Sequence, residues 1–152
     1  MVLAVAVSWL AFSALIRPYA FLYDPTVLEV AAEVNDRDTL EANTQLRIPA
    51  NATDIHGYVD GFQDVTTLLR FTLPAHDFED FLRQTDCAQP LYQGNSSTGY
   101  TMRDGNRLKS WRPEDARQFL ACADGHKNFR REFFIDTTDA DEYLIYVVAS
   151  TY

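Results

Sequence analysis

The segment VTTLLRFTL, residues 65–73, carries the clearest structural signal in the chain. Its side chains alternate with a period of two, which indicates a β-strand with two different faces. The odd and even positions form the two faces: Val65, Thr67, Leu69, Phe71 and Leu73 against Thr66, Leu68, Arg70 and Thr72. Pro74 cannot donate a hydrogen bond to a sheet, so it ends the strand. A helix is predicted next, over residues 74–84, because its apolar residues fall on one face.

The sequence before and after these two elements predicts further strands and a second helix. Three more strands are predicted, over residues 54–62, 128–136 and 142–150. A helix is predicted over residues 113–124, because Pro113 suits a first helical position and Gly125 suits a helix end. The order ββα then αββ predicts an α+β fold. We expect an antiparallel sheet of about four strands with two helices on one face, preceded by an N-terminal hydrophobic helix.

Motifs in the first half of this pattern resemble a known group of proteins. They are residues 52–58 (ATDIHGY), 61–64 (GFQD) and 69–74 (LRFTLP), together with Phe81-Leu82. In these motifs the chain resembles small uncharacterised bacterial extracytoplasmic proteins, many of them lipoproteins. The resemblance implies a location outside the cytoplasm and no known activity. No Cys follows the apolar N-terminal segment, so the resemblance does not extend to the lipid anchor.

The N-terminal segment is the most apolar part of the sequence. Residues 2–16 (VLAVAVSWLAFSALI) carry no charge. A helix of this length rises about 22 Å, less than the roughly 30 Å of a bilayer core, which is typical of a signal peptide. The span becomes long enough to cross if four residues lie at a membrane interface: Trp9, Arg17, Tyr19 and Tyr23. The alternative is a helix buried in the core of the domain.

Three regions follow from this pattern: a membrane anchor or signal segment (1–23), a helical stalk or linker (24–45) and an extracytoplasmic α+β domain (46–152). The domain is expected in the periplasm or at the cell surface, either anchored through residues 1–23 or secreted after cleavage.

The two cysteines also indicate whether the domain is exported. Cys87 and Cys122 are too far apart for a redox or zinc motif, and in an exported domain they predict one disulfide. This disulfide would clamp the two predicted helices together. The alternative is a pair of buried free thiols.

The composition argues against one class of partner. The 152 residues suffice for one domain with a short appendage, and they include 13 basic and 22 acidic side chains, a net charge of −9. Because an acidic surface repels phosphate, nucleic acid is not an expected partner.

The densest polar group on a predicted strand consists of Asp54, His56 and Asp60. On a regular strand these side chains point to one face, where they form a candidate metal site or acid–base pair. The alternative is a solvent-facing strand edge, which is favoured because Gly57 and Gly61 disturb the alternation. The chain has no nucleophile elbow, phosphate-binding loop or metal-binding motif, so no cofactor is predicted.

Three aromatic residues flank or occupy the polar loop at residues 87–110: Tyr92, Tyr100 and Trp111. Aromatic side chains on a loop beside a rigid sheet are common in recognition surfaces, so they are candidate partner-binding residues. The alternative is that they fold back over the helices.

These observations predict a non-enzymatic, membrane-tethered extracytoplasmic domain that binds another protein, as an accessory subunit of a membrane complex would. Residues 1–23 would contact lipid. One alternative is a hydrolase or metal-dependent enzyme that uses His56 and nearby carboxylates. The other is a freely secreted ligand-binding domain.

Overall fold

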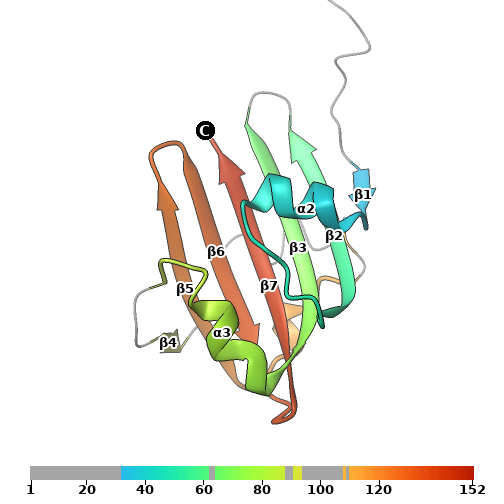
Figure 1. Ribbon diagram of the computed structural model, residues 1–152, viewed down its shortest axis with the longest axis vertical. Coiled ribbons are helices and arrows are strands. Elements are labelled where there is room, and N and C mark those ends of the chain that lie inside the picture. Colours follow the sequence, from blue (N-terminus) through green and yellow to red (C-terminus); the bar gives the residue numbers. More distant parts are fainter. Residues whose placement is uncertain (1–31, 62–63, 88–90, 94–107, 109) are drawn as a thin grey trace, which may run out of the picture.

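A seven-stranded antiparallel sheet forms the framework of the protein (Figure 1). The computed structural model describes residues 32–61, 64–87, 91–93, 108 and 110–152. Its strands are β1 (Ala32–Val34), β2 (Thr53–Gly61), β3 (Val65–Pro74), β4 (Tyr92–Gln93), β5 (Phe119–His126), β6 (Phe129–Asp136) and β7 (Glu142–Thr151). Their spatial order is β1-β2-β3-β7-β6-β5-β4, so the last strand of the chain lies at the centre of the sheet.

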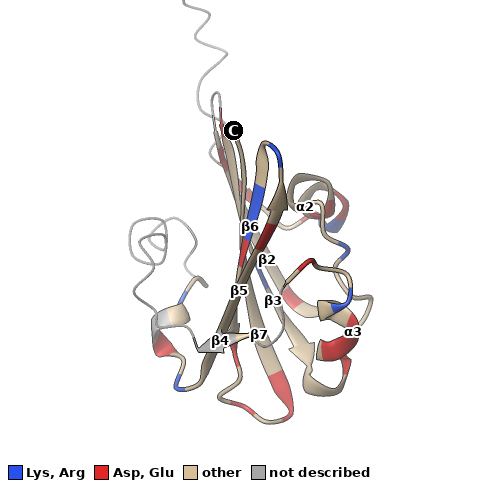
Figure 2. Ribbon diagram, turned by 90° about the vertical axis from the view of Figure 1, so that its left-hand side faces the viewer, with Lys and Arg blue, Asp and Glu red and all other residues tan. Residues whose placement is uncertain are grey.

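The helices are short, and both α-helices lie on the same side of the sheet. They are α2 (Arg37–Thr44) and α3 (Phe78–Leu82), and two 3₁₀ turns accompany them, η1 (Ala75–Asp77) and η2 (Pro113–Asp115). Figure 2 shows the sheet edge-on, with α2 and α3 on one side. We call this side the helix face and the other side the opposite face.

The alternation predicted for residues 65–73 is confirmed, and the two faces of the sheet build two cores. The helix face gathers Leu69, Phe71, Leu73, Phe133, Ile135, Ile145 and Val147 under Leu40, Phe78, Phe81 and Leu82. The opposite face gathers Leu68, Phe134, Tyr146 and Val148 under Leu108 and Trp111. The three central strands, β3, β7 and β6, therefore bury apolar side chains on both sides, and this burial fixes their register.

The predicted α+β fold class is wrong: the protein is mostly β, with more strands than expected and only short helices. The main error concerns residues 113–124. Pro113 does start a helical turn, but that turn is the three-residue η2, and the chain continues as strand β5. The side chains from Phe119 to Cys122 alternate between the two cores, and burying them on both sides of a sheet outweighs a local helix signal. The remaining predicted strands and the first predicted helix are present, the helix in a shortened form.

The N-terminal boundary of the folded domain lies earlier than the sequence pattern suggests. Residues 32–45, which were assigned to a stalk or linker, contain β1 and α2, and Leu40 is fully buried. The predicted hydrophobic helix and anchor at residues 1–23 lie outside the described residues. Within the described ranges, no helix combines the length and apolarity needed to cross a membrane.

Helix α2 packs closely against strand β2, and hydrogen bonds of charged side chains hold it in place. Its N-cap, Asp36, accepts a hydrogen bond from the backbone N–H of Thr39 at 2.9 Å. Gly57 of β2 permits the approach, because a Cβ there would overlap the side chain of Leu40 and come within 2.8 Å of a backbone oxygen. Arg37 donates to the carbonyl of Ile48 at 2.9 Å, which ties the segment after the helix back to its start.

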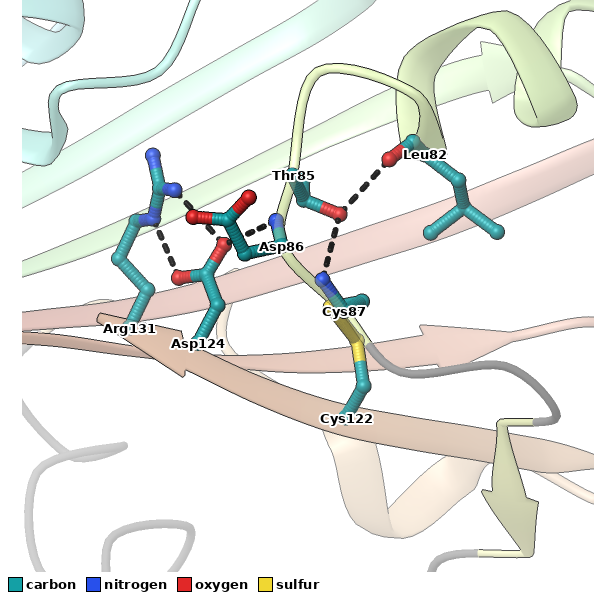
Figure 3. Close-up of a disulfide and its surroundings, with 7 residues drawn as sticks. All are labelled: Leu82, Thr85, Asp86, Cys87, Cys122, Asp124 and Arg131. Atoms are coloured by element: carbon teal, nitrogen blue, oxygen red, sulfur yellow. Dashed lines mark hydrogen bonds and ion pairs between the residues drawn. A yellow bond between two sulfur atoms is a disulfide. The ribbon is translucent and has the colours of Figure 1, made fainter. Parts of the chain in front are cut away.

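The predicted disulfide between Cys87 and Cys122 is confirmed (Figure 3). It does not clamp two helices, as the sequence suggested, because Cys122 lies in strand β5. It joins the segment that follows α3 to this strand, where Cys122 is buried in the helix-face core. Next to it, the side-chain hydroxyl of Thr85 accepts from the Cys87 backbone N–H at 3.4 Å and donates to the Leu82 carbonyl.

A buried ion pair lies beside the disulfide (Figure 3). Arg131 of β6 donates to both carboxylate oxygens of Asp124 of β5, each at 2.7 Å. The Asp124 side chain is fully buried and also accepts the backbone N–H of Asp86 at 3.1 Å. The Arg131 guanidinium lies over the rings of Phe129 and Phe133 and donates to the carbonyl of Gln45, at the C-cap of α2, at 2.6 Å. One guanidinium thus satisfies a buried carboxylate and the end of a helix.

We expect Arg131→Met to lower the free energy of unfolding by about 3–5 kcal/mol, because it leaves the Asp124 carboxylate buried without a cation. Urea unfolding followed by circular dichroism measures the change. Arg83→Met is the matched control: it removes an exposed ion pair with Asp80 and should cost at most about 1 kcal/mol. Equal losses of stability for the two variants would contradict the conclusion that the buried Arg131–Asp124 pair matters more to stability than an exposed one. Asp124→Leu combined with Arg131→Met should recover part of the loss, because no unpaired charge then remains.

Candidate functional site

A row of polar and aromatic side chains crosses the opposite face between β2 and β7. His56 is the register partner of Arg70 on β3, and Arg70 is the register partner of Tyr146 on β7. Register partners on one face have Cβ atoms about 5 Å apart, so these three side chains are immediate neighbours. Trp111 covers the inner end of the row, with its ring 5.0 Å from that of Tyr146 in an edge-to-face arrangement. We call these four residues, together with Asp54, the polar row.

Asp54 connects the two outer members of the polar row. One carboxylate oxygen contacts His56 Nε2 at 2.8 Å, and the other accepts from Arg70 Nη1 at 2.7 Å. The register of β2 shifts between Thr53 and His56, and Asp54 has a φ of 51°. This β-bulge lies where the Asp54 carboxylate meets Arg70 and His56. The sequence predicts Asp54 and His56 on one face of a regular strand, and in the structure their side chains are in contact.

The environment shifts the pKa values of two residues in the row. The hydrogen bond from Arg70, followed by that from His56, lowers the pKa of Asp54 below its usual value. Burial raises the pKa of Tyr146 to about 12, and the nearby charge of Arg70 opposes this rise. At neutral pH the row therefore holds an ionised carboxylate, a guanidinium and a neutral phenol.

The polar row passes from solvent into the core. The side chain of Asp54 is 51% exposed, and those of His56 and Arg70 are 32% and 14% exposed. Tyr146 and Trp111 are 1% and 2% exposed. The outer end is thus accessible to a partner molecule, whereas the inner end is shielded.

The other predicted site residues lie apart from this row or outside the described ranges. Asp60 faces Thr66, four residues further along β2 than His56. No group of three or more His, Cys, Asp or Glu side chains in the described ranges is placed to hold a metal ion. Tyr92 belongs to β4, and Tyr100 lies outside the described residues. Trp111 does belong to the polar row, but it is buried in the core of the opposite face and does not present its ring on the surface as predicted.

The predicted membrane-interface residues, Trp9, Arg17, Tyr19 and Tyr23, also lie outside the described part of the chain. Their assignment stays a prediction.

Sequence reasoning missed Arg70 and Tyr146. Arg70 carried a usable signal, because it is the one charged residue in an otherwise uncharged strand of nine residues. A charge in that setting requires a partner on the neighbouring strand. Tyr146 carried no such signal. It joins the row only because β7 pairs with β3, more than seventy residues earlier in the chain.

A second surface feature lies at the turn between β5 and β6. It is an open hollow of about 510 Å³, lined by Ala123, Asp124, Gly125, His126, Lys127, Phe129, Arg130 and Tyr152. Gly125 has a φ of 147°, and a Cβ there would come within 2.8 Å of the Arg130 Cα, so the turn requires glycine at this position. Arg130 is paired with Glu132 at 2.7 Å.

Comparison of the chain with protein-family models, with curated proteins and with solved structures finds no match.

The lowered pKa of Asp54 predicts how stability depends on pH. A carboxyl group whose pKa is lower in the folded state stabilises the protein above its unfolded pKa, about 4, and this contribution is lost as the pH falls through the folded pKa. We expect Asp54→Asn to be less stable than the parent protein at neutral pH. The difference should shrink below about pH 4 and vanish in strong acid, where both side chains are neutral. Urea midpoints measured across this range test the prediction, and a difference that does not change with pH contradicts it.

Proposed function

We propose that this protein is an extracytoplasmic, non-enzymatic binding domain, tethered to a membrane through residues 1–23 and engaged with a protein partner as an accessory subunit. The observation that carries the proposal is the Cys87–Cys122 disulfide. Structural disulfides form and persist in oxidising compartments and are rare in the cytosol. The apolar segment at residues 2–16 supplies a route to such a compartment.

The position of the first described strand fits a tether. Ala32 starts β1 and pairs with Val59, so the chain enters at the end of the sheet that also carries the β2–β3 and β5–β6 turns (Figure 1). Between an anchor ending at residue 23 and Ala32, residues 24–31 span at most about 28 Å when fully extended. A tether of this length would keep the domain close to the bilayer surface, within reach of the extramembrane part of a neighbouring membrane protein.

The state of Asp54 favours binding over catalysis. Its carboxylate is shared between Arg70 and His56, and its pKa is lowered by both. A carboxylate with a lowered pKa is a weak general base near neutral pH. The same arrangement supports recognition, because a partly exposed, fixed set of charges provides directional hydrogen bonding at a binding surface.

The redox state of the cysteines tests the location. In the full chain expressed in a bacterial host, the cysteines should resist alkylation until a reductant is added, as read by a mass shift on a gel. In a variant that lacks residues 2–23 and stays in the cytoplasm, they should react at once. Alkylation is carried out on the denatured protein, because Cys122 is buried in the fold. Under these conditions Cys87→Ser supplies the control, since it leaves one reactive thiol in either case. Cysteines that are reduced in the full chain would overturn the proposed location. The intact mass of the mature protein separates tethering from secretion, because a cleaved product lacks the apolar segment.

One observation supports a second function, a hydrolase or metal-dependent enzyme. The 2.8 Å contact between His56 Nε2 and Asp54 is the geometry in which a carboxylate orients a catalytic imidazole. His56→Ala distinguishes the two functions. Under the binding proposal, the variant stays folded and keeps the partner that crosslinks to it in the membrane. Under the enzyme alternative, the parent protein holds a stoichiometric metal ion or hydrolyses a substrate, and the variant loses that property.

A further inference from the structure

Strand β5 forms the outer margin of the sheet over half of its length (Figure 1). The two-residue strand β4 pairs only with Leu120 and Ala121 of β5. In the part of the chain that the structure describes, no strand lies beside residues 123–126 on that side. Burial follows the same division, because Ala121 is 1% exposed whereas Ala123 and Gly125 are exposed. Residues 123–126 are thus an accessible sheet edge, which we call the β5 edge, and Figure 2 shows the molecule from this side.

The hairpin turn determines which backbone groups the β5 edge presents. His126 and Phe129 are register partners across a two-residue turn, in which Lys127 has a φ of 47°. The residues that close such a turn bond to each other, and successive residues of an antiparallel strand bond alternately to either side. Ala123 and Gly125 therefore direct their N–H and C=O groups away from β6. They lie about 7 Å apart along the strand, the spacing that an added β-strand matches.

The open hollow at the β5–β6 turn lies along the same edge, because residues 123–126 all belong to its lining. Ala123 and Gly125 share the opposite face with Ala121 by strand alternation, and they place there only a methyl group and a hydrogen. The side chains of an added strand therefore have room on this face. Tyr152, which is 65% exposed, also lines the hollow and adds an aromatic side chain, a type enriched at protein interfaces.

The other margin of the sheet is built differently. Its outermost strand, β1, has only three residues, and the β-bulge between Thr53 and His56 interrupts the regular course of β2. Short edge strands and bulges are devices that block the addition of further strands. Strand β5, by contrast, pairs with β6 in unbroken register from Phe119 to His126, so its edge keeps the regular spacing of a strand.

The charge around the hollow favours an acidic partner. Three basic side chains line it, those of His126, Lys127 and Arg130. The one carboxylate in the lining, Asp124, is neutralised by Arg131. The whole chain carries a net charge of −9, so the hollow is a local reversal of charge. Complementary charge at such a site steers and orients a negatively charged segment.

Gly125 fixes where an acidic side chain of that segment lies. Gly125 and Arg130 are register partners, so an added strand places one side chain in line with both of them. Glycine has no side chain to stand between this position and Arg130, whose side chain is 56% exposed. Arg130 already bonds to Glu132 at 2.7 Å through Nη2, and its remaining N–H groups can donate to a second carboxylate.

We propose that the β5 edge binds an extended segment of the protein partner as an added β-strand, with an aspartate or glutamate in line with Gly125. Backbone hydrogen bonds to Ala123 and Gly125 supply the affinity, and contact of the acidic side chain with Arg130 and Lys127 supplies the specificity. This inference rests on the proposed protein-binding function and names the surface and the chemistry through which the partner is bound.

Nuclear magnetic resonance of the full-length chain in detergent micelles tests the site with two blocked peptides, acetyl-TETET-amide and acetyl-TKTKT-amide. We expect the acidic peptide to shift the backbone amide signals of Ala123 and Gly125 until they saturate, and to slow their hydrogen exchange. The basic peptide should bind more weakly. The acidic peptide with its backbone nitrogens methylated should not bind, because it cannot donate hydrogen bonds to the edge.

Two variants with matched controls separate backbone pairing from charge. Ala123→Pro removes the outward N–H and leaves the pairing with β6 in place, so it should abolish binding, whereas Ala123→Ser should bind like the parent protein. The methylated peptide makes the same test on the unaltered protein. Arg130→Gln should weaken binding of the acidic peptide about two- to fivefold, the effect of losing an exposed ion pair. Arg83→Gln, in the exposed pair with Asp80, should leave binding unchanged.

Four results would overturn the proposal. They are a Gly125 amide signal that does not saturate with the acidic peptide, equal binding of its methylated form, tighter binding of the basic peptide, and protection of the Gly125 amide that rises with protein concentration alone. The last result would assign the β5 edge to a second copy of the chain. Any of them in a protein whose cysteines are oxidised would remove this surface and leave the proposed extracytoplasmic location intact.

Discussion

The guanidinium of Arg131 joins parts of the chain that lie far apart in the sequence. It donates to both oxygens of the buried carboxylate of Asp124 on the neighbouring strand, and to the carbonyl of Gln45 at the end of helix α2. Asp124 in turn binds the backbone of Asp86, one residue before the disulfide. A buried carboxylate is tolerated only while its cation stays in place, so the sheet, the first helix and the segment after α3 depend on one another here.

The two faces of the sheet carry different features. The helix face carries the ion pair, the disulfide and the larger core, and it fixes how the helices lie on the strands. The opposite face carries a smaller core and the polar row from Asp54 to Trp111.

The proposed function accounts for the disulfide together with the apolar N-terminal segment. The disulfide favours an oxidising compartment, and the apolar segment at residues 2–16 favours export or insertion. A domain held near a membrane and built as a rigid sheet suits the role of an accessory subunit, because the tether raises the effective concentration of partner and domain.

The sequence by itself determined the strand positions around residues 54–62, 65–73, 128–136 and 142–150, the cysteine pair, and the closeness of Asp54 and His56. Each of these follows from a local pattern or from simple counting. The sequence did not determine that residues 119–126 form a strand, because the signals at Pro113 and Gly125 are those of a helix. Nor did it place Arg70 beside Tyr146 or Arg131 against Gln45. Those contacts join residues separated by more than seventy positions, and only the burial of β7 between β3 and β6 brings them together.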